Sequence, residues 1–133
     1  MKIIYYLCVL LVLTSCTNKD LSDGDPYPLL ALFTPEKNLD DVTVKVIGYF
    51  GYWDGDIPVL FATYGDIQKS DGLYKSHIIY QYDSNVKKAA TADVGKICIF
   101  KATVWYRGKI PTLDNASLVE CKTGVRRDFL QSK

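Results

Sequence analysis

Hydrophobic and polar residues alternate along much of the chain beyond residue 41. Val42, Val44 and Val46 are separated by Thr43 and Lys45, which is the period of two typical of a strand with one buried face. Further runs rich in β-branched and aromatic residues follow. Together with the first run they predict five strands, at residues 42–50, 59–64, 76–82, 96–106 and 116–122.

The connections between these runs carry their own signals. Gly48 and Gly51 interrupt the first strand, which predicts a bulge or a sharp coil there. Residues 52–56 contain Asp-Gly and predict a turn, and residues 65–72 form a polar connection. Residues 85–92 follow two N-cap candidates, Asp83 and Ser84, and predict a short helix between the third and fourth strands.

The chain starts with a different pattern. Lys2 precedes an almost unbroken apolar run over residues 3–13. This run is too short for a transmembrane helix, which needs about 20 apolar residues, and it fits the apolar region of a signal peptide, which has about 7–15. Thr14 and Ser15 are small enough to precede a cleavage site before Cys16.

The sequence Leu13-Thr14-Ser15-Cys16 resembles the lipobox of bacterial lipoproteins. The resemblance implies that residues 1–15 are removed, that Cys16 is lipidated with palmitate-type acyl chains, and that the protein is tethered to a membrane of the cell envelope. Thr17 stands where an aspartate is associated with inner-membrane retention, so the resemblance implies the outer membrane, with the domain facing the periplasm. The alternatives are a secretory signal with an incidental cysteine and a buried strand.

Three segments result: a signal peptide at residues 1–15, a lipidated N-terminus and tether at 16–39, and a β-domain at 40–133. The first part of the tether is polar and is expected to be disordered. Residues 28–33 are too apolar for a free linker and predict a short helix or a segment packed across a barrel end. The alternative is a flexible tether with an apolar patch.

Charge narrows the class of partner. The chain has 16 Lys and Arg against 15 Asp and Glu, and Lys2 is the only charged residue of the signal, so the mature protein balances 15 against 15. Nucleic-acid binding requires a basic surface, so we expect no nucleic-acid partner.

Two of the four cysteines remain after Cys8 leaves with the signal and Cys16 takes lipid. A hairpin that turns near Gly108-Lys109 places Cys98 opposite Cys121, and with them Phe100 opposite Val119 and Ala102 opposite Ser117. This register favours a disulfide in an oxidising compartment, and the alternative is two reduced, buried thiols.

The order of five strands with a short helix resembles the OB-fold, a Greek-key barrel. Residues 42–50 resemble its first strand, with a glycine at mid-strand, and residues 92–102 resemble its helix exit and fourth strand. The ending Leu118-Val119-Glu120-Cys121 resembles the last strand of small OB-fold lipoproteins and of tRNA-anticodon-binding-like bacterial domains. Ala102 departs from the family pattern, which often has a second glycine there.

Catalytic and metal motifs are sparse. His77 is the single histidine, and its position predicts a half-exposed strand residue. The pairs Asp54/Asp56 and Asp40/Asp41 offer too few oxygens for a calcium site and suit turns better. We therefore expect no enzyme activity, no cofactor and no metal.

One group of residues suits binding. In an OB-fold, ligands meet the sheet face between the first and the last hairpin loops, which here carry aromatic and cationic residues: Tyr52, Trp53, Trp105, Tyr106, Arg107 and Lys109. The alternative is that these aromatic residues cover the barrel ends or pack as core. Two functions follow: a non-catalytic envelope module that binds a protein, peptidoglycan or another glycan, or an immunity- or inhibitor-type lipoprotein that caps a toxin or envelope enzyme.

Overall fold

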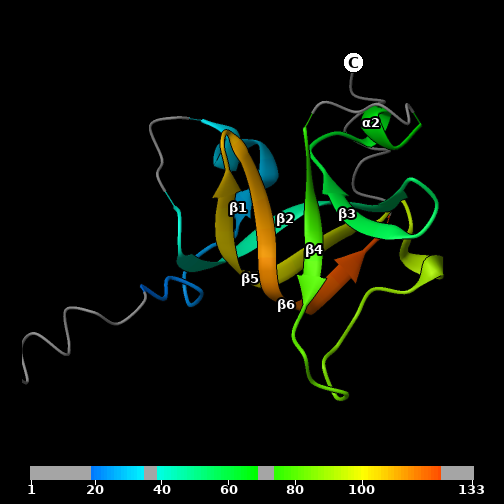
Figure 1. Cartoon of the computed structure of the whole chain (residues 1–133). Helices are drawn as coiled ribbons and strands as arrows, with labels where there is room; N and C mark the ends of the chain where they lie inside the picture. The colour runs from blue at the N-terminus through cyan, green and yellow to red at the C-terminus, as the bar shows by residue number, and fades with distance from the viewer. Residues whose placement is uncertain (1–18, 35–38, 69–73, 124–133) are drawn as a thin grey trace, which may run out of the picture.

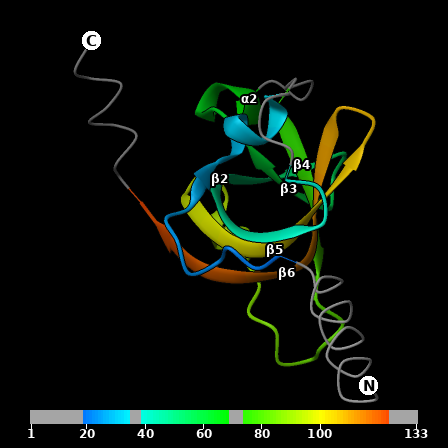
Figure 2. The same ribbon diagram turned by 90° about the vertical axis from the view of Figure 1, so that its left-hand side faces the viewer.

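The computed structural model describes residues 19–34, 39–68 and 74–123. Its strands wrap into a closed five-stranded barrel, which confirms the expected all-β, OB-like fold (Figures 1 and 2). Sheet neighbours follow the order β2-β3-β4-β6-β5, and β5 pairs back onto β2. The barrel strands are β2 (Val42–Trp53), β3 (Ile57–Phe61), β4 (Lys75–Tyr80), β5 (Ile97–Arg107) and β6 (Ile110–Lys122).

Strand β2 belongs to both sides of the barrel. Its first part pairs with β5 from Val42 to Tyr49, and its last part pairs with β3 from Tyr49 to Trp53. The register against both neighbours is continuous, so the two glycines mark a coil and not a bulge. Gly51 lies under the Phe61 ring, whose Cε2 would be 2.9 Å from a Cβ at this position. The missing side chain therefore permits the close approach.

The barrel interior is filled by the alternating apolar positions of the strands. Four aromatic rings meet there, with Phe50 and Tyr52 at 5.2 Å, Phe50 and Phe100 at 6.3 Å, and Tyr80 and Phe100 at 6.1 Å between centroids. Aliphatic side chains surround them, and the fully buried ones include Val44, Val46, Leu60, Val104 and Leu113. The period of two in the sequence thus identifies the core correctly.

The segment before the barrel is packed onto it. The Thr43 N–H donates to the Lys19 carbonyl at 2.9 Å, and the Leu21 N–H donates to the Thr43 carbonyl at 2.7 Å. Strand β1 (Tyr27–Pro28) then pairs in parallel with β2 (Figure 2). Over residues 19–27 the structure therefore differs from the expected disordered tether.

The apolar run after β1 closes one end of the barrel, as the sequence predicted for residues 28–33. It forms a 3-10 helix, η1 (Leu29–Phe33), and buries Leu29 and Leu32 in the core. The Tyr106 hydroxyl donates to the Leu32 carbonyl at 2.6 Å and ties η1 to β5.

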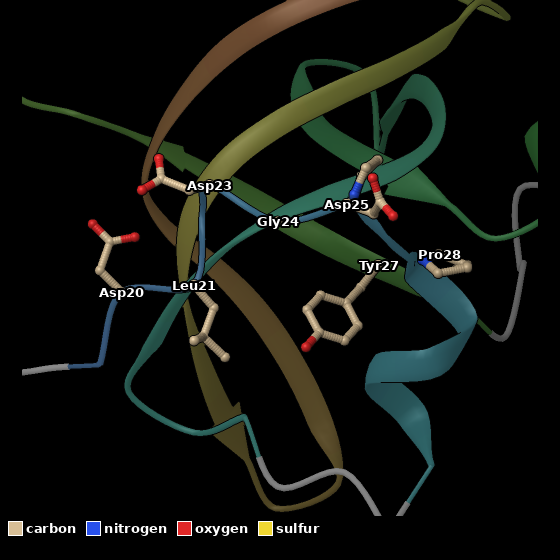
Figure 3. Close-up of a pocket in the computed structure, with 8 residues that line it drawn as sticks. Asp20, Leu21, Asp23, Gly24, Asp25, Tyr27 and Pro28 are labelled. Carbon is tan, nitrogen blue, oxygen red and sulfur yellow. The ribbon is translucent and has the colours of Figure 1, made fainter.

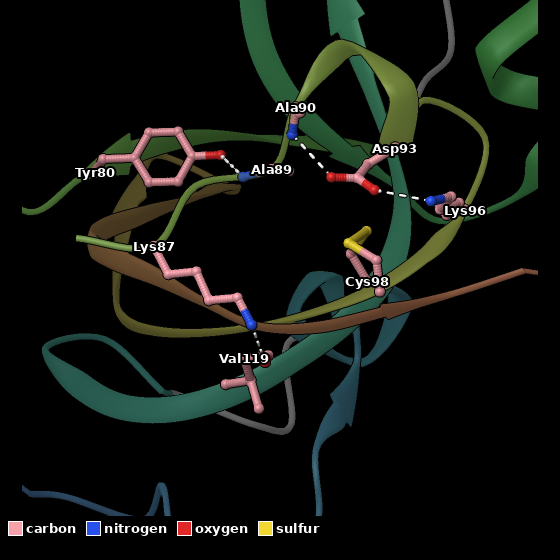
Figure 4. Close-up of a disulfide and its surroundings, with 9 residues drawn as sticks. Tyr80, Lys87, Ala89, Ala90, Asp93, Lys96, Cys98 and Val119 are labelled. Atoms are coloured by element: carbon pink, nitrogen blue, oxygen red, sulfur yellow. Dashed lines mark hydrogen bonds and ion pairs between the residues drawn. A yellow bond between two sulfur atoms is a disulfide. The ribbon is translucent and has the colours of Figure 1, made fainter. Parts of the chain in front are cut away.

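The predicted helix at residues 85–92 is wrong. This part of the chain begins in a turn at residues 84–85 and is irregular up to a short 3-10 helix, η2 (Thr91–Asp93). Figure 4 shows the segment beside the barrel. Its backbone groups bond to other parts of the chain and not within a helix. The Ala89 N–H donates to the Tyr80 hydroxyl at 3.1 Å, and the Lys87 carbonyl accepts from the Leu118 N–H at 2.8 Å. The α-helix of the described chain, α2 (Tyr64–Gln68), instead joins β3 to β4, where a polar connection was expected.

Cys98 and Cys121 form the predicted disulfide, with their Cα atoms 4.0 Å apart (Figure 4). The register around it was only partly predicted. Phe100 lies opposite Leu118 and not Val119, and Ser117 pairs with Lys101 and not Ala102. The reason is that β6 carries two irregularities that the assumed straight hairpin lacked.

Residues 1–18, including Cys16 and the whole predicted signal, lie outside the described residues. Within the described ranges, none of the helices has the length and apolar character needed to cross a bilayer.

Candidate functional site

The outer face of β3 carries an apolar cluster of its own. Val59 and Phe61 alternate with Leu60, which lies in the barrel core, so both point outward. Both are nevertheless buried. His77 pairs with Val59 and Lys75 pairs with Phe61, so these two β4 residues lie on the same face.

Trp53 joins this outer cluster from the end of β2. Its ring stacks on His77, with centroids 5.6 Å apart and planes 30° apart. The Lys75 Nζ lies 5.0 Å from the centroid of the same ring, which is cation–π geometry. Trp53 therefore holds two outward side chains of β4 in place.

Strands β4 and β6 separate beside this cluster. Their parallel register begins at Ile78 opposite Leu113 and continues to Tyr80 opposite Ala116, and no pairing joins the described residues upstream of it (Figure 1). A cavity of about 360 Å³ opens where the strands diverge. We call it the β4–β6 groove, and it is lined by Trp53, Lys75, His77, Ile79, Arg107, Ile110 and Thr112.

The lining of the groove is apolar and cationic. Ile79 and Ile110 expose 49% and 59% of their surface, although both are large aliphatic residues. Lys75 and Arg107 supply positive charge, and neither Asp nor Glu is among the described residues of the lining. This combination suits a ligand with an apolar part and an anionic group.

The structure brings only two of the six predicted binding residues into the groove. Trp53 and Arg107 line the groove. Trp105 points outward and is 53% exposed beside its cross-strand partner Thr112, which lines the groove. Lys109 is exposed in the tight turn between β5 and β6.

Tyr52 and Tyr106 pack with the core and do not line the groove. Tyr52 makes an edge contact with Phe50 inside the barrel. The Tyr106 hydroxyl is bound to Leu32, and its backbone N–H donates to the Asp40 carboxylate at 3.1 Å. Partial burial, with the negative charge of Asp40, raises the pKa of Tyr106 above its usual value.

Sequence reasoning missed five groove residues: Lys75, His77, Ile79, Ile110 and Thr112. Strand parity offers a signal for the first three, because alternate residues of β4 share one face. No local signal indicates that β4 and β6 diverge, since this depends on the pairing of strands far apart in the chain.

A second cavity, of about 530 Å³, lies along the segment from Asp20 to Pro28 (Figure 3). Its carboxylates do not converge: Asp20 and Asp23 lie on one side and Asp25 on the other (Figure 3). The Ser22 N–H donates to Asp20 at 2.9 Å, and the hydrogen bonds from Ser22 lower the pKa of Asp20. Within the described residues, no group of three or more His, Cys, Asp or Glu side chains is placed to hold a metal ion.

Comparisons of the chain with protein-family models, curated proteins and solved structures find no match in any of the three.

Proposed function

We propose that this protein is a lipid-anchored, non-catalytic binding module of the bacterial cell envelope, which takes a protein or glycan partner in the β4–β6 groove. The observation that carries the proposal is the groove itself, an apolar and cationic cavity of about 360 Å³ on the surface of a small barrel. Concave sites with exposed apolar walls and a few converging polar groups are the usual form of a binding site.

The chemistry of the lining favours binding over catalysis. General acid–base catalysis needs a titratable group within reach of the proton it moves, and such groups usually work in pairs or with an orienting partner. In the groove His77 is stacked against Trp53, and the lining residues that the structure describes include no carboxylate. The residues that remain bind by charge and by apolar contact.

The anchor rests on the sequence Leu13-Thr14-Ser15-Cys16. Cells grown with radiolabelled palmitate should label the wild-type protein and leave Cys16→Ser unlabelled. Equal labelling of both proteins would reject lipidation at Cys16, while the proposal of a binding site in the groove would be unaffected.

Groove binding is tested with the full chain in detergent, used to retain envelope proteins or muramidase-digested peptidoglycan. Arg107→Ala should reduce retention in a salt-dependent way, because a cation at a binding face acts through screened electrostatics. Lys109→Ala is the matched control, since it removes another exposed cation of the same hairpin that is not among the lining residues of the groove. Equal retention by wild type and Arg107→Ala would reject the site.

The same experiment separates the two functions. Retained glycan fragments support a glycan-binding module. Stoichiometric capture of a single envelope enzyme or toxin, with loss of that protein's activity, supports the alternative of an immunity- or inhibitor-type lipoprotein.

A further inference from the structure

We infer that the partner in the β4–β6 groove is a protein, bound through a segment that presents an aliphatic side chain beside an Asp or Glu carboxylate. The inference rests on the proposed function and deepens it by choosing between the two classes of partner. Three features of the groove support it.

The first feature is charge. Arg107 lies at the end of β5 beside the opening, and the described residues of the lining include no carboxylate. Asp54 and Asp56, in the β2–β3 turn, follow Trp53 in the chain and lie outside the lining. A carboxylate of the partner therefore fits best at Arg107, because guanidinium binds carboxylate through two parallel hydrogen bonds.

The second feature is the shape of the apolar surface. Ile79 and Ile110 provide the exposed apolar side chains, and both are branched and aliphatic. Such side chains pack well against Leu, Ile or Val of a partner, with favourable burial of apolar area. The pair faces the space that β4 and β6 leave between them.

The third feature is the state of the tryptophan. Sugars are usually recognised by stacking on an open aromatic face. The Trp53 ring already stacks on His77 and carries the Lys75 Nζ at 5.0 Å from its centroid. Trp105, the more exposed ring, does not line the groove. The contacts with His77 and Lys75 already occupy part of the Trp53 ring on which a glycan would stack.

The experiment is a selection of peptides from a displayed random library on the immobilised full chain. Enriched peptides should carry Asp or Glu next to Ile, Leu or Val. A synthetic peptide of the enriched sequence should shift the amide resonances of Ile79, Ile110 and Thr112 and the indole resonance of Trp53. Arg107→Glu should weaken its binding by about tenfold or more, because the charge is reversed at the contact. Lys109→Glu, the control with the same charge change, should stay within about twofold.

Each result decides the matter. A library that yields no enriched peptide, peptides without an acidic residue, or resonance shifts outside the groove would overturn the inference. Digested peptidoglycan that shifts the groove resonances when no peptide does would also overturn it, while the proposed function would stand. If neither probe shifts the groove and Arg107→Glu retains envelope partners as the wild type does, the proposed function falls as well.

Discussion

Cys98 faces Cys121 because β6 carries two more residues than β5 between the turn and the disulfide. The hairpin begins with Arg107 opposite Ile110, and its register shifts once between Lys101 and Thr103 and again between Ile99 and Phe100. Asn115 lies at the first shift, with a φ of 51°. Two bulges thus bring the cysteines together, and they also twist the end of the barrel where the bridge lies.

The disulfide should contribute a large part of the stability of this small domain. Its cysteines are 23 residues apart, and under the chain-entropy model a loop of this size is worth about 3 kcal/mol. The double variant Cys98→Ala/Cys121→Ala should lose about this much free energy of unfolding in urea. A reductant should bring the wild type to the same midpoint and leave the variant unchanged, and an unaffected wild type would contradict the prediction.

Gly51→Ala should destabilise the outer cluster. The new Cβ would lie 2.9 Å from Phe61 Cε2, so a buried ring must move, at a cost of about 1–3 kcal/mol. The control is Gly65→Ala in α2, where a Cβ would lie 3.9 Å from Thr63 Oγ1, an ordinary van der Waals contact. That control should be neutral or slightly stabilising, because alanine favours helix. Thermal melts of the two variants compare them directly, and equal melting temperatures would argue against the close approach.

Leu32→Ala should show that η1 is part of the folded barrel. Leu32 is fully buried, and truncation of such a side chain costs about 2–5 kcal/mol. Leu30, two residues earlier in the same 3-10 helix, is 48% exposed, so Leu30→Ala should change stability by less than about 0.5 kcal/mol. If the Leu32→Ala variant is as stable as wild type, η1 does not contribute to the folded barrel and acts only as a tether.

Asp93 should make stability depend on pH. The Ala90 N–H donates to its carboxylate at 2.8 Å and the Lys96 Nζ lies 3.0 Å away, and both interactions lower the pKa of Asp93 below 3.8 (Figure 4). A lowered folded-state pKa stabilises the protein above the unfolded pKa, and this contribution is lost as the pH falls through the folded value.

Wild type should therefore exceed Asp93→Asn by about 0.5–1 kcal/mol at neutral pH, the size of a helix-cap or exposed ion-pair interaction. Urea unfolding from pH 7 to pH 2.5 measures the gap, which should close below about pH 4. A gap that stays constant over this range would show that the charge of Asp93 contributes nothing.

The sequence predicts the barrel strands well because their signal is local. Val42, Val44 and Val46 alternate with polar residues, and this period alone fixes the buried face of β2. The prediction of a helix at residues 85–92 failed because helix propensity is weak and tertiary hydrogen bonds override it. Here the Lys87 carbonyl is bonded to Leu118 of β6, and the Ala89 N–H is bonded to the Tyr80 hydroxyl.

The candidate site was predictable only in part. Trp53 and Arg107 flank the turns where an OB-like barrel places its ligand, so the loop argument finds them. Ile79 and Ile110 line the groove because two strands distant in sequence diverge, which no local pattern reports. Tyr106 was predicted to bind a ligand because it is an aromatic residue beside a loop. In the structure its hydroxyl instead holds η1 through the Leu32 carbonyl.

The attachment of Lys19 to Thr43 limits how far a lipid at Cys16 could stand from the barrel. Lys19 is the third residue after Cys16, and three residues of fully extended chain span at most about 11 Å. With acyl chains on Cys16, the connection to the membrane would be too short for the barrel to tumble freely. The Val42 end of β2 would then lie at the lipid headgroups. Trp53, at the opposite end of the strand, would then point into the periplasmic space, so the anchor would set the orientation of the groove as well as its location.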